Sequence, residues 1–182
     1  HRQTNGTEFS RQGCAEKVEI SENGHISQVP VTSCGLNGRP LKASGIYPAA
    51  ICCHLTDSTV SNRIDYNDPI MTIQVKITER NNQSYITCIK DKTTVGYKYF
   101  DFCGKINLMP EFRGRFDGQI IVSHDEKGEM PIGRLDISLE TDAWKVHMIP
   151  VAPQTGPNAL YFNFSGEGQL EFKTFGFAEP FA

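Results

Sequence analysis

The chain has 182 residues, and its 18 lysines and arginines against 21 aspartates and glutamates give a formal net charge of −3. This length suits one domain of about 150 residues with a surplus of about 30. A hydrophobic content of 38% is too high for a disordered chain. No apolar run approaches the roughly 18 residues of a membrane-spanning helix, and a pI near 6.0 without a basic stripe argues against nucleic acid. We therefore expect a globular domain whose partner is neither a membrane nor a nucleic acid.

Short segments rich in β-branched and aromatic residues recur along the chain, separated by Gly, Pro, Asn and Asp. The predicted strands cover residues 70–78, 95–102, 106–112, 119–122, 132–139, 143–151, 159–164 and 169–177. Apolar residues alternate within them with a period of two, which is typical of an antiparallel sandwich or barrel. Since no stretch shows convincing helical periodicity, the sequence predicts an all-β fold.

The N-terminal part of the chain differs from the rest. Residues 17–20 and 25–32 flank S-E-N-G at 21–24, where Asn-Gly supplies the positive φ angles of a tight hairpin. Residues 34–40 have the composition of a linker, and we place a boundary near residues 42–45. Because a lone hairpin is only marginally stable in water, we expect this β-hairpin segment to pack on the sandwich or on another part of the protein.

Residues that could catalyse a reaction or bind a metal lack the spacing that such chemistry needs. The six cysteines contain no C-x-x-C pair, the histidines show no H-x-x-x-H spacing, and no serine stands in G-x-S-x-G. D-E-K-G-E at 125–129 lacks the spaced acidic pattern of a calcium loop. We expect thiols that pack as small hydrophobes, with Cys14–Cys34 as the one disulfide to check, and no catalytic residue, metal ion or cofactor.

Four motifs follow one another towards the C-terminus. They are G-Q-I-I-V-S with P-I-G-R-L within 118–135, T-D-A-W at 141–144, A-L-Y-F-N-F-S-G at 159–166 and L-E-F-K-T-F-G-F at 170–177. In this order and with these gaps they resemble family-6 carbohydrate-binding modules, and residues 95–102 look like a further strand of that family. The resemblance implies a jelly-roll β-sandwich over residues 44–182.

The N-terminal segment carries a second resemblance. H-R-Q-T-N at 1–5 and F-S-R-Q-G-C-A-E at 9–16 look like the end of the catalytic propeller of family-43 glycoside hydrolases, which runs directly into an appended sandwich. The resemblance implies that residues 1–43 are a propeller remnant plus a linker. It also implies a parent α-L-arabinofuranosidase or β-xylosidase whose catalytic carboxylates lie upstream of His1. The cellular location stays open.

The binding-module family holds its sugar with two aromatic rings and an asparagine, which the resemblance carries over to this chain. Trp144 fits one ring, and Tyr85 lies close to the position of the second, which aligns near Cys88. Glu171 stands where the family has the asparagine. We expect Trp144, Tyr85, Glu171 and Asn163 to contact carbohydrate, although core packing is the usual role of a lone tryptophan in a sandwich.

The resemblance also implies a structural calcium site, from which this sequence departs. Residues 46–55 contain none of the acidic ligands of the family's first strand, and Lys173 stands where the last strand has an aspartate. Because an ammonium group repels a divalent cation, we expect no calcium at this position.

Two functions are compatible with the sequence. The first is a carbohydrate-binding module that holds a glycoside hydrolase near plant polysaccharide of the xylan or arabinan type, with that polysaccharide and its own catalytic domain as partners. The alternative is a structural domain that has lost sugar binding and buttresses the propeller. An exposed Trp144 beside an open cleft favours binding, whereas a buried Trp144 favours buttressing.

Overall fold

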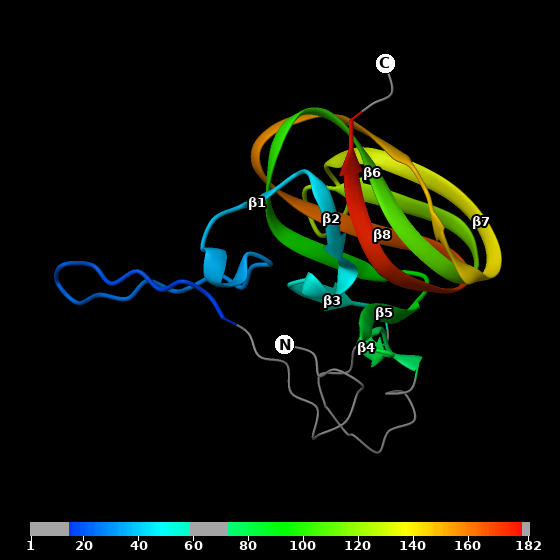
Figure 1. Ribbon diagram of the computed structural model, residues 1–182, viewed down its shortest axis with the longest axis horizontal. Helices are drawn as coiled ribbons and strands as arrows, with labels where there is room; N and C mark the ends of the chain where they lie inside the picture. The colour runs from blue at the N-terminus through cyan, green and yellow to red at the C-terminus, as the bar shows by residue number, and fades with distance from the viewer. Residues whose placement is uncertain (1–14, 59–72, 180–182) are drawn as a thin grey trace.

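The structure, a computed structural model, describes residues 15–58 and 73–179, and it confirms the predicted all-β sandwich (Figure 1). In chain order its elements are the 3-10 helix η2 (Gly35–Asn37), β1 (Leu41–Lys42), β2 (Gly45–Pro48), the 3-10 helix η3 (Ala49–Ile51), β3 (His54–Thr56), β4 (Lys76–Arg80), β5 (Gln83–Ile89), β6 (Thr94–Ser123), β7 (Pro131–Val146) and β8 (Ile149–Ala178). Within the described ranges, no helix is long and apolar enough to cross a membrane. His1, Cys14 and the start of the predicted strand 70–78 lie outside the described residues.

Three long, bent strands, β6, β7 and β8, make most of the sandwich (Figure 1). β8 pairs antiparallel with both halves of β6, so that Asn163 faces Thr94 on one side and Ile121 on the other. β7 pairs with the second half of β6, and the β4–β5 hairpin joins β8 through β5. This double pairing folds the sheet over itself and encloses one of its faces as the core.

Several predicted strands are joined in the structure. The segments 95–102, 106–112 and 119–122 all belong to β6, because the glycines between them bend the strand at bulges without ending it. In contrast, the predicted strand over 143–151 is interrupted, since β7 ends at Val146 and β8 begins at Ile149.

The turn of the expected N-terminal hairpin is present, but only Gly24 has the expected positive φ, whereas Asn23 does not. The backbone N–H of Gly24 donates to the carbonyl of Ser21 at 2.8 Å, and Gly24 has a φ of 80°. The arms pair through one isolated bridge, Ile20–Ile26, rather than through longer strands. The segment extends away from the sandwich (Figure 1), which explains why its arms find no neighbouring strand to extend the pairing.

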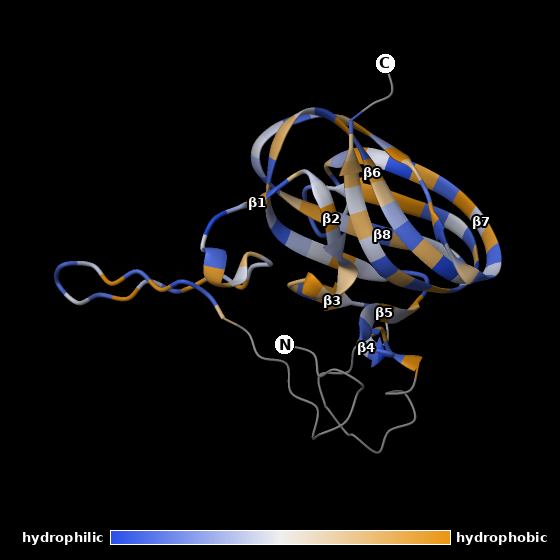
Figure 2. Ribbon diagram, viewed as in Figure 1, coloured by the Kyte–Doolittle hydropathy of each residue, from blue (hydrophilic) through white to orange (hydrophobic). Residues whose placement is uncertain are grey.

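Aromatic side chains fill the space between the layers. The largest fully buried ones are Tyr97, Phe100, Phe112, Phe116, Phe162, Phe164, Phe172 and Phe175. The ring centroid of Phe172 lies 4.8 Å from that of Phe112 and 5.3 Å from that of Phe162, in the tilted and edge-on arrangements that aromatic pairs prefer. Figure 2 shows hydrophobic and hydrophilic residues alternating along the long strands. Because the hydrophobic residues of each strand are buried in the core, the hydrophilic residues that alternate with them face outward.

Two glycines face each other where β6 and β8 approach closely, Gly118 and Gly166. A Cβ atom on Gly118 would lie 2.7 Å from the Cα atom of Gly166, so the neighbouring backbone would have to shift. We expect Gly118→Ala to lower the free energy of unfolding by about 1–3 kcal/mol, measured by urea unfolding. Gly176→Ala is the control, because its Cβ would meet its nearest atoms at 3.4 Å. Equal losses in both variants would contradict the expectation.

His147, just after β7, links stability to pH. Burial lowers the pKa of its ring, and its buried Nε2 atom makes no hydrogen bond within the described residues. An unfolded histidine titrates near pH 6.5, so below that pH the unfolded chain binds more protons and the folded state loses stability as the pH falls.

We expect His147→Phe to flatten the dependence of the free energy of unfolding on pH between about pH 7 and 5. The replacement keeps a ring beside Phe112, whose centroid lies 5.9 Å from that of His147. Urea unfolding at a series of pH values measures how steeply the free energy of unfolding changes with pH. An identical slope in the variant and the unaltered chain would show that His147 does not cause this dependence.

Candidate functional site

The end of β8 presents charged side chains on the outer face of the sheet. Leu170 and Phe172 are 1% and 0% exposed, and their burial turns the alternate residues Glu171 and Lys173 outward. The side chains of Glu171 and Lys173 remain 27% and 24% exposed. The packing of the core thus fixes where these two charges lie.

The neighbouring strand β6 places Arg113 beside Glu171. Arg113 follows the buried Phe112 and is paired in register with Glu171. The Nε atom of Arg113 donates to Oε2 of Glu171, and the hydroxyl of Thr87 donates to Oε1 at 3.3 Å. Because both carboxylate oxygens of Glu171 are engaged, Glu171 holds the guanidinium of Arg113 in place.

Two aromatic rings and this guanidinium form the centre of the candidate site. The ring centroids of Tyr85 on β5 and Trp144 on β7 lie 5.6 Å apart at an interplanar angle of 71°. The Cζ atom of Arg113 lies 4.4 Å from the ring centroid of Trp144 and 5.4 Å from that of Tyr85. At these distances the guanidinium is attracted to both rings. Tyr85 is 6% exposed and Trp144 is half-buried.

Two hollows open beside these rings. The smaller, of about 180 Å³, is lined by Arg80, Asn81, Gln83, Tyr85, Arg113 and Trp144. The larger, of about 480 Å³, shares Arg80 and Arg113 with it and is also lined by Asp142 and Glu171. The surface therefore combines aromatic rings, side-chain amides and charged groups around open space, and its lining is mostly polar.

Lys173 occupies the neighbourhood in which the resemblance implied a calcium ion. Its Nζ atom lies 3.4 Å from Oε2 of Glu111 and 5.3 Å from the ring centroid of Trp144. The same carboxylate accepts a hydrogen bond from the hydroxyl of Thr174 at 2.9 Å. An ammonium and one engaged carboxylate do not fit a divalent cation, which takes six to eight oxygen ligands. Within residues 15–58 and 73–179, no cluster of three or more His, Cys, Asp and Glu side chains could hold a metal.

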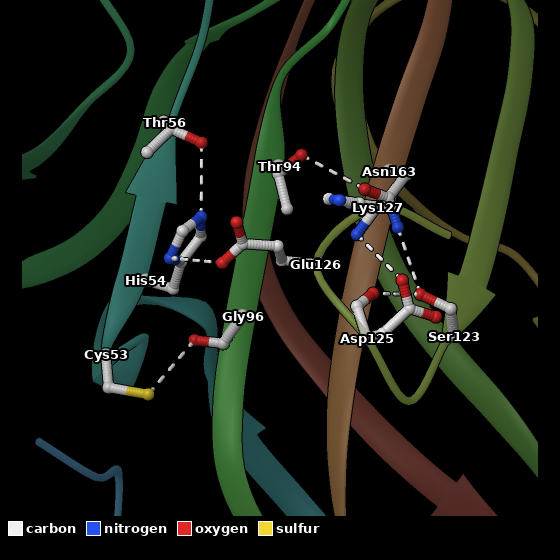
Figure 3. Close-up of polar contacts among 10 residues, drawn as sticks. All are labelled: Cys53, His54, Thr56, Thr94, Gly96, Ser123, Asp125, Glu126, Lys127 and Asn163. Carbon is white, nitrogen blue, oxygen red and sulfur yellow. Dashed lines mark hydrogen bonds and ion pairs between the residues drawn. The ribbon is translucent and has the colours of Figure 1, made fainter. Parts of the chain in front are cut away.

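The structure brings three of the four expected sugar-binding residues together but not Asn163. Tyr85, Trp144 and Glu171 meet around Arg113, whereas Asn163 belongs to a separate polar network (Figure 3). The side chain of Asn163 donates to the hydroxyl of Ser123 at 3.1 Å and accepts from that of Thr94 at 3.0 Å. Asn163 lines neither hollow, because its side chain joins β8 to both halves of β6.

Asp125 and Cys53 lie near this second network (Figure 3). The carboxylate of Asp125 accepts the backbone N–H groups of Lys127, Glu129 and Met130, so it stabilises its own turn. Burial raises the pKa of the Cys53 thiol, and nearby donors oppose this only in part. Cys53 is therefore protonated at neutral pH and is not the thiolate that nucleophilic catalysis requires.

Five cysteines fall within the described residues, and none of them forms a disulfide there. Cys34 is buried, as expected for a thiol that packs as a small hydrophobe, whereas Cys103 is exposed. The expected pairing of Cys34 with Cys14 involves a residue outside the described ranges.

Sequence reasoning missed Arg113, Arg80, Asn81 and Gln83. Arg113 directly follows the buried Phe112 in a segment with a period of two, so its outward orientation could have been predicted. The other three lie on the β4–β5 hairpin, whose strand β5 was not predicted. The Asn81-Asn82 pair indicates this hairpin, since both residues have a positive φ, as in a type I′ turn.

The bent sandwich has the same fold as solved family-6 carbohydrate-binding modules. The module CsCBM6-3 of Clostridium stercorarium, solved with cellobiose, superposes with a TM-score of 0.63 at 15% identity, over 79% of this chain and 99% of the module. A family-43 arabinoxylan arabinofuranohydrolase of Bacillus subtilis, solved with cellotetraose, gives a TM-score of 0.58 at 17% identity, over 91% of this chain and 33% of the enzyme. No protein-family model matches the chain.

A sequence relative makes the likeness more specific. The chain is 38% identical over 181 residues, or 96% of its length, to a Thermoclostridium stercorarium protein described as a xylosidase/arabinosidase. The chain spans 38% of the length of that relative. The expected resemblance to a glycoside hydrolase of this kind and to a family-6-like module is confirmed.

Proposed function

We propose that residues 44–182 form a non-catalytic carbohydrate-binding module that holds a glycoside hydrolase near plant polysaccharide. The observation that carries this proposal is the Tyr85–Trp144 ring pair beside an open hollow. The fold and the xylosidase/arabinosidase relative support it. The ligand would be an oligosaccharide or polysaccharide of the xylan or arabinan type.

Each group at the hollow has a chemical role in this proposal. The C–H face of a sugar ring packs on Trp144 beside Tyr85, and its hydroxyls exchange hydrogen bonds with the amides of Asn81 and Gln83. The guanidinium of Arg113 adds donors. Glu171 positions Arg113 through their hydrogen bond, and Asn163 is not part of the proposed site.

The parent enzyme and the domain boundary belong to the same proposal. The relative supports a parent with α-L-arabinofuranosidase or β-xylosidase activity, and residues 1–43 would be the end of its propeller plus a linker. The family-43 neighbour covers 91% of this chain and the isolated module 79%, which supports assigning the N-terminal residues to the enzyme rather than to the module. The catalytic domain would then be a partner of residues 44–182.

Calorimetric titration of the 182-residue chain with xylo- and arabino-oligosaccharides tests the function. We expect saturable binding of at least one series, and weaker binding of the free monosaccharide because it offers fewer contacts. Failure of every oligosaccharide to bind would reject the proposal.

A structural role remains the second candidate, because Arg113 and Lys173 both lie against Trp144 and compete with a sugar for its ring. Several apolar side chains of the N-terminal segment are also exposed, Ile20 by 66% and Ile26 by 55%, as expected of a segment that packs on another domain. This role predicts no oligosaccharide binding, together with a higher unfolding temperature for the catalytic domain when residues 44–182 are attached to it.

A further inference from the structure

The smaller hollow is positively charged. Two of the six residues that line it are arginines, Arg80 and Arg113, and none of the six is acidic. Asp142 and Glu171, which share the larger hollow with both arginines, do not line the smaller one. A group that enters beside Trp144 therefore meets two guanidinium groups and no carboxylate.

The two arginines differ in whether their charge is already compensated. Arg113 is paired with Glu171 and stacked on Trp144. Arg80 is an exposed residue at the end of β4, and no ion pair within the described ranges involves it. Its charge and its donors are thus available to a ligand, while Arg113 remains fixed as part of the wall.

The geometry points to an acidic sugar as the occupant. We propose that the smaller hollow binds a uronic acid residue of an oligosaccharide, with its carboxylate at Arg80 and its ring against Tyr85 and Trp144. This inference rests on the function proposed above and adds the class of sugar. The planar fork of a guanidinium matches a carboxylate with two parallel hydrogen bonds, a pairing that a hydroxyl of a neutral sugar cannot reproduce.

The size and the remaining groups of the hollow agree with this assignment. Its volume of about 180 Å³ is smaller than the roughly 300–1,000 Å³ of sites that enclose a drug-sized ligand, so it suits one sugar ring. The side chains of Asn81 and Gln83 can exchange hydrogen bonds with the hydroxyls of that ring. The rest of the oligosaccharide would extend over the larger hollow next to it.

The test compares three probes on the 182-residue chain by calorimetry. They are a xylo-oligosaccharide that carries one glucuronic acid residue, the same compound with its carboxyl group reduced to an alcohol, and the unsubstituted xylo-oligosaccharide. We expect the acid to bind about tenfold more tightly than its reduced form at low salt, with a smaller difference as the salt concentration rises.

Arg80→Gln is expected to abolish this preference, so that the acid and its reduced form bind the variant with equal affinity. Arg115→Gln is the matched control, because Arg115 is an exposed arginine on β6 that lines neither hollow. Arg115→Gln should keep the tenfold preference for the acidic probe. An equal loss of this preference in the two variants would show a general attraction between charges and would overturn the inference.

The outcomes separate this inference from the proposed function. Equal binding of the acidic and reduced probes by the unaltered chain would overturn the acidic-sugar assignment and leave carbohydrate binding intact. Absence of binding by all three probes, and by arabino-oligosaccharides, would reject the proposed function and this inference with it.

Discussion

Trp144→Ala is expected to weaken oligosaccharide binding by about 10- to 100-fold, the usual effect of removing a central aromatic anchor. Trp144 supplies the largest ring of the site, lines the smaller hollow, and has its centroid 5.6 Å from that of Tyr85. Its loss would remove the stacking surface and also the ring on which Arg113 rests. Calorimetric titration with a xylo-oligosaccharide measures the change.

Two further variants make this expectation specific. Val146→Ala removes an exposed apolar side chain, 57% accessible, from the same strand but outside both hollows, and it should leave the affinity unchanged. Trp144→Phe keeps a smaller ring and should retain part of the affinity. If Trp144→Ala bound as tightly as the unaltered chain, the ring pair would not be the sugar site.

Phe172→Ala is expected to have the largest effect on stability, lowering the free energy of unfolding by about 3–5 kcal/mol. Phe172 is fully buried and packs against Phe112, Phe162 and Phe175. Removing its ring leaves a cavity that the paired strands β6 and β8 cannot close. Urea unfolding followed by circular dichroism gives the free energy.

Ile46→Ala is the control for this loss, because Ile46 is 76% exposed and its truncation should change the free energy of unfolding by less than about 0.5 kcal/mol. Since Phe172 lies between Glu171 and Lys173, Phe172→Ala should also weaken sugar binding indirectly. A loss in Phe172→Ala no greater than that in Ile46→Ala would contradict the described core.

The fold could be predicted from local pattern because the long strands obey it closely. Leu170 and Phe172 alternate with Glu171 and Lys173, and this alternation identifies both the strand and its buried face. The joining of three predicted strands into β6 could not be predicted from this alternation. Whether a glycine such as Gly104 ends a strand or bends it depends on the pairing with β8, which brings residues distant in sequence together.

The candidate site was partly accessible from sequence. Trp144 and Glu171 stand in the motifs, and Tyr85 lies close to the position implied for the second ring. The three residues lie together around Arg113. The contribution of Arg80 depends on the β4–β5 hairpin folding back towards β7, a tertiary arrangement that no local pattern carries. Asn163 lies within a matching motif on the same strand as Glu171, but at a different position along β8, where its side chain bonds Thr94 and Ser123.

The central claim is that carbohydrate binds at the Tyr85–Trp144 ring pair, and the fluorescence of Trp144 tests it most directly. Trp144 is the single tryptophan of the chain, so its emission reports on this site alone. Titration with a xylo-oligosaccharide that binds by calorimetry should shift or quench the emission saturably, with the same Kd. Binding by calorimetry without any change in the emission of Trp144 would contradict the account.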